Sequence, residues 1–355
     1  MSRGWPEPAV PVATVALRFR TDPDCPAVAN MSAAVRVGAT LFLAGDENAA
    51  IERLTRDGGD WGNHLRLPLA DLLDLSDAEE EADLEGLAID GDWLWVLGSH
   101  ARTRPKLKKD QPQIDTRALA DLKDTRPRCI LARLPLVERD GAWLPVREDG
   151  DRRAAMLKPN KRGNALAAMI ADDALLSPFT RIPAKEGGVD MEGIAVCGNR
   201  VAFGMRGPVI GGNAVLIEAR TRTTKKGNLK LAGDPVKRLL KMEGLGIRDL
   251  KRCGDHLLIL AGPTTSLSGP CALYLWRGWA NDPPHDAHSL RLHRPERLFD
   301  LPFGRGEDHP EGLALWDGNR LLVVNDSPAK SRLSDEGRTL KADLYDLPAF
   351  EEATQ

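Results

Sequence analysis

The sequence of 355 residues predicts an all-β fold, and more narrowly a β-propeller, from three observations. A strand–turn–strand pattern recurs along the chain, and the second strand of each copy is almost wholly apolar. Turn-forming residues are abundant, with 33 Gly and 25 Pro. Four-stranded units in tandem are typical of propellers, whose blades pack around a central channel. Such packing would bury both faces of each second strand, which explains the apolar runs.

Three copies share a Glu-Gly-Leu/Ile-Ala head: DLEGLAIDGDWLWVLG from Asp83, DMEGIAVCGNRVAFGM from Asp190, and HPEGLALWDGNRLLVV from His309. Two weaker copies are GIRDLKRCGDHLLILAG, with Arg248 in place of Glu, and NMSAAVRVGATLFLAG, with Ser32 there. Four of the five copies turn at a Gly flanked by Asp, Asn or Cys. Such turns supply the positive φ that two-residue hairpins require, so each copy predicts a hairpin.

The spacing of the copies favours five blades over six, within one propeller domain spanning residues 10–350. The step from Glu85 to Glu192 is about twice the others, and we interpret the excess as two insertions. One is a charged, Pro-flanked insert at 102–128; the other is an insert at 151–186 with a short helix near 163–178. An alternating strand at 11–19 is expected to complete the last blade and close the ring, the alternative being a loose N-terminal arm.

The heads of the copies are expected to converge near the axis. In a propeller the first strand of each blade lines the channel, and the loop after the second strand returns to the same face. The converging residues would be Ser32, Glu85, Glu192, Arg248 and Glu311 from the heads, and Asp46, His100, Arg206, Asn325 and Asp326 from the loops, with Asp83 and Asp190 beside them. Carboxylates that crowd together repel each other unless something neutralises them.

Two remedies for this repulsion remain open from the residues alone. A hard cation such as Ca²⁺ would bind the carboxylate oxygens, or Arg206 and Arg248 would pair with them. A structural explanation also stands, in which Glu caps backbone groups and Gly permits close approach at the axis. Because Ser32 and Arg248 replace Glu in two copies, the fold does not require Glu there, which favours a functional site.

The repeated heads, GIRDL at Gly246 and HPEGLAL near the end resemble a bacterial family known as domain of unknown function 3616. That resemblance covers most of the chain and implies a fold without a mechanism. The heads are also similar to those of calcium-dependent propellers, the gluconolactonase-like enzymes and the esterase-like phytases. This second resemblance implies a calcium ion held by Glu85, Glu192, Glu311, Asn325 and Asp326, although Arg248 departs from an all-oxygen ring.

We therefore expect a metal-assisted hydrolase that cleaves an ester, lactone or phosphoester at the axial site. His100 or Asp46 would act as the general base, and Arg206 and Arg248 would hold an anionic group of a small-molecule substrate. The alternative is a propeller that binds a protein or ligand without catalysis, since fold alone does not decide function.

Net charge, cysteine content and the absence of long apolar runs limit the classes of partner and compartment that the sequence predicts. A net charge of −3 gives no electrostatic reason to expect nucleic acid or an anionic membrane as a partner. Five cysteines without a CxxC pair argue for a reducing compartment. Neither a secretory leader nor a run of 18 apolar residues is recognisable, so the sequence predicts a cytoplasmic protein.

Overall fold

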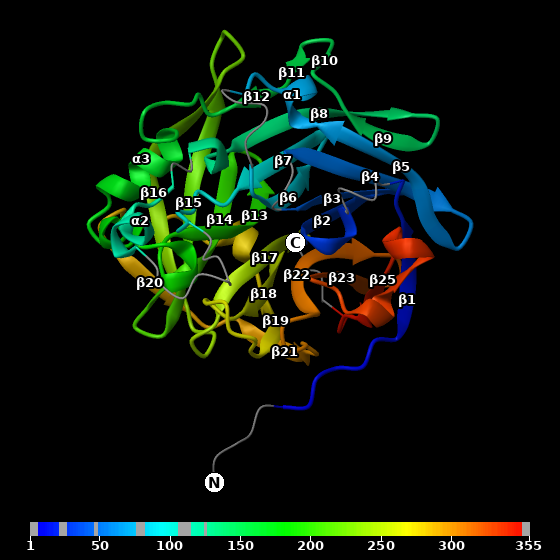
Figure 1. Ribbon diagram of the computed structural model, residues 1–355. Helices are drawn as coiled ribbons and strands as arrows, with labels where there is room; N and C mark the ends of the chain where they lie inside the picture. The colour runs from blue at the N-terminus through cyan, green and yellow to red at the C-terminus, as the bar shows by residue number, and fades with distance from the viewer. Residues whose placement is uncertain are drawn as a thin grey trace.

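The strands of the protein are arranged as a β-propeller around one axis (Figure 1). The computed structural model describes residues 6–20, 27–45, 49–75, 82–105, 115–123 and 126–349. Among these residues the sheets divide into five groups, each built on four antiparallel strands. The predicted all-β propeller is thereby confirmed.

The first group contains β2 (Met31–Val37), β3 (Thr40–Gly45), β4 (Ala50–Asp57) and β5 (Asp60–Pro68). The second contains β6 (Leu84–Asp90), β7 (Trp93–Gly98), β8 (Leu131–Arg139) and β12 (Ala155–Met156). The third contains β13 (Asp190–Cys197), β14 (Arg200–Ile210), β15 (Asn213–Thr223) and β16 (Leu229–Leu240). The fourth contains β17 (Gly246–Cys253), β18 (His256–Gly262), β19 (Cys271–Trp276) and β21 (Glu296–Leu301). The fifth contains β22 (His309–Trp316), β23 (Arg320–Asp326), β25 (Thr339–Asp346) and β1 (Ala13–Arg18).

The remaining strands and helices are short and lie outside the four-stranded groups. The additional strands are β9 (Ala142–Pro145), β10 (Glu148–Asp149), β11 (Arg152–Arg153), β20 (Leu290–His293) and β24 (Leu333–Ser334). The α-helices are α1 (Leu69–Leu72), α2 (Thr116–Ala120) and α3 (Ala165–Asp172). The 3-10 helices are η1 (Ala27–Ala29), η2 (Arg126–Arg128), η3 (Ser177–Arg181), η4 (Ala184–Glu186), η5 (Trp279–Asn281), η6 (Lys330–Arg332) and η7 (Asp335–Gly337).

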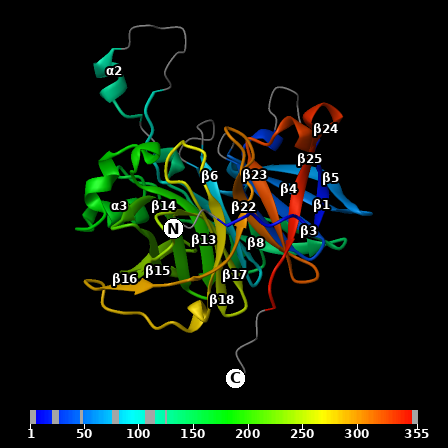
Figure 2. The same cartoon turned by 90° about the horizontal axis from the view of Figure 1, so that it is seen from below.

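Short helices lie in two of the connections between strands. Between β7 and β8 lie α2 and η2, and α2 stands clear of the main body in Figure 2. Between β12 and β13 lie α3, η3 and η4, so the predicted helix near 163–178 is confirmed as a shorter helix followed by a 3-10 turn. In the described part of the chain, no helix is long and apolar enough to cross a membrane.

The first strands of the groups form a closed inner circle. Each of β2, β6, β13, β17 and β22 contacts the next, and β22 contacts β2. Apolar clusters fill the spaces between neighbouring groups. Strand β7 shows why the second strands are apolar throughout: Leu94 and Val96 pack toward the first group, whereas Trp95 and Leu97 pack toward the third.

The N-terminal strand closes the ring. β1 pairs antiparallel with β25 over six residues, from Ala13 opposite Leu344 to Arg18 opposite Thr339. Its inward side chains Val15 and Leu17 are buried in the cluster between the fifth and first groups. The prediction that the strand at 11–19 completes the last blade is therefore confirmed, and the alternative of a loose arm is wrong.

A β-bulge marks the head of every inner strand. The register shifts at the same place in all five: Ser32, Glu85, Glu192, Arg248 and Glu311. A bulge leaves one residue out of the ladder and re-aims its side chain. The repeated sequence position is thus a repeated backbone feature, which presents one side chain from each group at the same level of the axis.

The glycine of the motif has a separate, structural role. A Cβ on Gly193 would lie 2.7 Å from Leu250 Cγ of the next inner strand, and one on Gly312 would lie 3.1 Å from the backbone of Ala33. Glycine therefore permits adjacent inner strands to approach closely, as the structural explanation anticipated.

A buried ion pair crosses the channel where β17 has no such glycine. Asp249 occupies that position and accepts hydrogen bonds from Leu313 N of β22 (2.7 Å) and from Lys251 Nζ (2.6 and 2.7 Å). Lys251 Nζ also lies 3.2 Å from Leu87 O on β6. Burial raises the pKa of Asp249 to about 6, against the lowering effect of Lys251. The pair links three inner strands, from β22 through β17 to β6.

Removing only the cation of this pair should destabilise the protein strongly. We expect Lys251→Met to lower the free energy of unfolding by about 3–5 kcal/mol, because Asp249 is left buried without its partner. Urea denaturation measures this loss. The double variant Asp249→Asn/Lys251→Met keeps an oxygen for Leu313 N and should recover at least half of the loss; a double variant as unstable as the single one would contradict this account.

Candidate functional site

Two adjoining cavities lie at the heads of the inner strands. The larger, the axial cavity, has a volume of about 370 Å³; its lining includes Asp83, Glu85, Arg102, Lys123, Lys185, Asp190, Glu192, Arg206, Glu311 and Asp326. The smaller, the side cavity, has a volume of about 200 Å³ and shares Lys185, Arg206, Glu311 and Asp326 with it. Arg248 lines the side cavity. The inner circle therefore brings together most of the residues that the repeat singled out.

Arginines neutralise the buried carboxylates of this cluster. Glu192 lies between two guanidinium groups: its Oε1 accepts a 2.8 Å hydrogen bond from Arg206 Nη1, and its Oε2 is 2.8 Å from Arg248 Nε. Arg248 Nη2 also pairs with Glu311. The four side chains form one chain of ion pairs, the ion-pair chain Arg206–Glu192–Arg248–Glu311. Of the two remedies that the sequence left open, arginine pairing is present.

Backbone contacts fix Arg206 within that chain. Its Nε donates to Pro263 O (3.2 Å) and its Nη2 to Thr265 O (2.9 Å). Burial alone would lower its pKa, but the carboxylates of Glu192 and Asp190 raise it overall. Arg206 therefore stays charged. Because its Nε, Nη1 and Nη2 already donate to protein oxygens, it holds the site in place and is a poor donor to a ligand.

Asp190 is a buried carboxyl group of the axial cavity whose pKa is raised. It is 5% exposed, and Arg206 Nη1 is 3.8 Å from its Oδ2. Burial, helped by the negative charge of Glu192, raises its pKa to about 7, and Arg206 only partly opposes this. Near neutral pH Asp190 can therefore either hold or release a proton.

The equivalent aspartate of the second group is held differently. Asp83 accepts hydrogen bonds from Ser99 Oγ and from Arg128 Nη1, the latter at 2.7 Å. Arg128 belongs to η2 in the first insert, and the repeat pattern gave no signal for it. Asp83 and Asp190 occupy the same repeat position. Arg128 from the insert binds Asp83 directly, whereas in the described part of the chain the guanidinium nearest to Asp190 is that of Arg206, at 3.8 Å.

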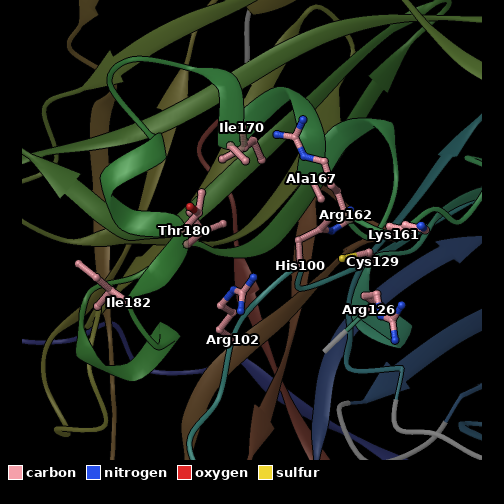
Figure 3. A pocket seen from close by; sticks show the side chains of 12 residues that line it. His100, Arg102, Arg126, Cys129, Lys161, Arg162, Ala167, Ile170, Thr180 and Ile182 are labelled. Carbon is pink, nitrogen blue, oxygen red and sulfur yellow. The ribbon is translucent and has the colours of Figure 1, made fainter. Parts of the chain in front are cut away.

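His100 lies away from the carboxylate cluster. It lines a different cavity, with Arg102, Arg126, Lys161 and Cys129 around it (Figure 3). Asn325 is buried on β23 and is not among the described residues that line the axial or the side cavity. Asp46 lies outside the described residues.

The described axial residues do not fit a calcium ion. Ca²⁺ takes six to eight oxygen ligands, but both oxygens of Glu192 already face guanidinium groups, and Glu311 pairs with Arg248. A dication beside Arg206 and Arg248 would be repelled by both. In the described part of the chain, no group of three His, Cys, Asp or Glu side chains is arranged to hold a metal. The calcium site remains a prediction that metal analysis tests.

The inserts contribute cations that the repeat analysis did not identify. Arg102 and Lys123 come from the first insert and Lys185 from the second; all three are exposed at the axial cavity. With the described residues they form no ion pair, whereas Arg104 beside them is paired with Glu186. Only the charge of the inserts was visible in the sequence, because their position over the axis is a tertiary feature.

A family model described as a protein of unknown function (DUF3616) matches residues 30–343. The chain belongs to this family. The resemblance seen in its repeated heads is thereby confirmed, and no curated protein matches the sequence.

Several solved structures are similar to this DUF3616 protein at low sequence identity and low TM-score. They include a Myxococcus xanthus glutaminyl cyclase (13% identity, TM-score 0.40, 95% of this chain and 100% of that chain). They also include the Cps50 (Swd1) β-propeller domain from Myceliophteria thermophila (8%, 0.34, 94% and 99%). A third is the PQQ-bound aldose sugar dehydrogenase from Streptomyces coelicolor (12%, 0.34, 95% and 100%). At this level the similarities say nothing about the activity of this chain.

The raised pKa of Asp190 predicts a pH-dependent cost in stability. The folded protein holds this proton up to about pH 7, whereas an unfolded aspartate releases it near pH 4, so stability falls as pH rises between these values. We expect Asp190→Asn to be more stable than the wild type by roughly 1–3 kcal/mol at pH 8 and nearly equal at pH 4. Urea unfolding at both values measures this, with Glu186→Gln as the control; a variant less stable at pH 8 would sink the assignment.

Pairing by arginine predicts that calcium neither copurifies nor stabilises. Elemental analysis of the natively purified protein should give far less than one calcium ion per chain, and added Ca²⁺ should leave the melting temperature unchanged. Near-stoichiometric calcium that is lost in Glu192→Ala would show that the ion-pair chain opens to bind the metal.

Proposed function

We propose that the axial cavity binds a small anionic molecule and hydrolyses an ester, lactone or phosphoester bond in it. The observation that carries the proposal is the position of Asp190: a buried carboxyl group that lines the cavity next to the ion-pair chain, and whose only ion-pair partner among the described residues is Arg206, at 3.8 Å. Groups poised in this way serve as general acids or bases.

Size and charge support an anionic substrate. A volume of about 370 Å³ is in the range of small-molecule sites. The ion-pair chain balances its own charges, two arginines against two glutamates. Arg102, Lys123 and Lys185 are exposed at the mouth and form no ion pair with described residues, so they are the side chains that would contact an anionic group, although carboxylates such as Glu85 and Asp326 line the same cavity.

The proposed reaction uses Asp190 as a proton carrier. The ionised carboxylate takes a proton from water as the water oxygen bonds to the carbonyl carbon or phosphorus. The protonated carboxyl group then gives that proton to the leaving oxygen as the scissile bond breaks. A cationic side chain at the mouth, such as Lys185, would neutralise the negative charge that develops on the substrate oxygen. Water is consumed, and Asp190 ends in its starting state.

Binding without catalysis is the second candidate, and the ion-pair chain favours it. Glu192, Glu311, Arg206 and Arg248 satisfy one another before any substrate arrives, as in a rigid recognition surface. On this hypothesis the cationic mouth holds an anionic ligand or an acidic segment of a partner protein, and Asp190 has no chemical role.

Hydrolysis is tested with p-nitrophenyl esters, p-nitrophenyl phosphate, bis(p-nitrophenyl) phosphate and a panel of lactones, each with and without Ca²⁺. We expect Asp190→Asn to lower kcat/KM at least about 100-fold on any substrate that the wild type cleaves, because the proton carrier is lost. In the wild type, kcat/KM should fall as the pH drops below about 7, where Asp190 becomes protonated.

Glu186→Gln is the matched control, since Glu186 is an exposed carboxylate at the same cavity, and it should keep the wild-type rate within about threefold. A wild type that is inactive on the whole panel, or an Asp190→Asn variant with full activity, would overturn the hydrolase. The binding hypothesis would then stand on ligand-induced shifts in melting temperature.

A further inference from the structure

A further cavity of about 400 Å³ is lined by His100 and by residues of both inserts (Figure 3). We call it the insert cavity. The first insert contributes Arg102 and Arg126, and the second contributes Lys161, Arg162 and one side of α3. None of these residues except Arg102 lines the axial cavity. The insert cavity is therefore a separate site that shares one arginine with the axial one.

The charge of the insert cavity is of one sign. Four cationic side chains line it, Arg102, Arg126, Lys161 and Arg162, and the described lining contains no carboxylate. Arg162 is paired with Asp172, which lies outside the lining. Arg102 and Lys161 form no ion pair with any described residue. An anion that entered the cavity would be attracted by these side chains.

The inner surface of the same cavity is apolar. Ile170 and Val189 are buried there, and Ile182 and Ala171 line it beside them. An aliphatic floor contributes nothing to the binding of a bare ion, which stays hydrated. It favours a ligand that also carries an apolar group, because that group would be removed from water.

Hydrogen bonds hold the walls of the cavity in place. His100 Nδ1 donates to Gly98 O (2.8 Å), so its Nε2 accepts from Asn164 Nδ2 (3.0 Å). Asn164 in turn caps α3 by accepting from Ala167 N (2.9 Å). Burial lowers the pKa of His100 to about 4, so this residue is neutral and adds no charge to the lining. The helix is thereby fixed to the second group, and the cavity is formed before a ligand binds.

We propose that the insert cavity binds a small organic phosphate, with its phosphate among Arg102, Arg126, Lys161 and Arg162 and its apolar group against Ile170 and Val189. Phosphate suits this set better than a carboxylate does, because its three oxygens and greater charge can accept from several guanidinium groups at once. The proposal concerns a different cavity from that of the proposed hydrolase and stands without it.

The test uses phenylphosphonate, which joins an anionic head to an apolar ring and has no ester bond to cleave. Isothermal titration calorimetry should give a dissociation constant below about 1 mM at low ionic strength, weakening as salt is added. Inorganic phosphate has only the anionic group and benzyl alcohol only the apolar ring. Each should bind at least about tenfold more weakly than phenylphosphonate.

Two variants locate the binding, and a third is the matched control. Lys161→Gln removes a cation that lines only the insert cavity and should weaken binding at least about fivefold. Ala171→Leu leaves every charge in place and should weaken it similarly by filling the apolar part. Lys185→Gln makes the same charge change at the axial and side cavities and should leave binding unchanged.

Equal loss in Lys161→Gln and Lys185→Gln would place the ligand elsewhere and overturn the proposal. So would an absence of binding up to about 5 mM, or inorganic phosphate binding as tightly as phenylphosphonate. Thermal unfolding of each variant confirms that it is folded before the titration.

Discussion

Close packing of the inner strands at the axis is the constraint on which the rest of the structure depends. Five strands meet there, and glycine at Gly193 and Gly312 lets neighbours approach to distances that a Cβ would forbid. The bulge one residue earlier takes the adjacent side chain out of the ladder and presents it at the axis. The bulge, which is repeated in all five groups, therefore assembles the residues of the site, and the glycine after it allows the close approach in three of them.

Charge neutralisation decides what those assembled residues can do. Glu192 and Glu311 would repel each other at the axis, and Arg248, in the Glu position of the fourth group, pairs with both. Because the fourth group has Arg248 where three other groups have Glu, the buried carboxylates of Glu192 and Glu311 gain a cationic partner. Asp190 lies 3.8 Å from Arg206 instead of within the ion-pair chain, and burial raises its pKa to about 7.

The inserts make an almost symmetric ring asymmetric. They interrupt the second group and precede the third, and they bring Arg102, Lys123 and Lys185 to the axial cavity. They also enclose the insert cavity, whose walls are held by the contact of His100 with Asn164. The two cavities differ in charge: cations and carboxylates line the axial cavity in nearly equal number, whereas the described lining of the insert cavity contains cations and no carboxylate.

Hairpin periodicity in the sequence was enough to predict the propeller and the closing strand β1. Propeller topology then predicted that Glu192, Arg248 and Glu311 converge. The pairing of these charges could not be predicted, since a repeat position specifies where a side chain starts and not which neighbour it reaches. His100 shows the difference: its position after β7 suggested the axis, but the hydrogen bond to Asn164 holds it in another cavity. Lys251 shows it again: Asp249 is two residues away on the same strand, but Leu87 O on β6 comes within reach of Lys251 Nζ only in the folded ring.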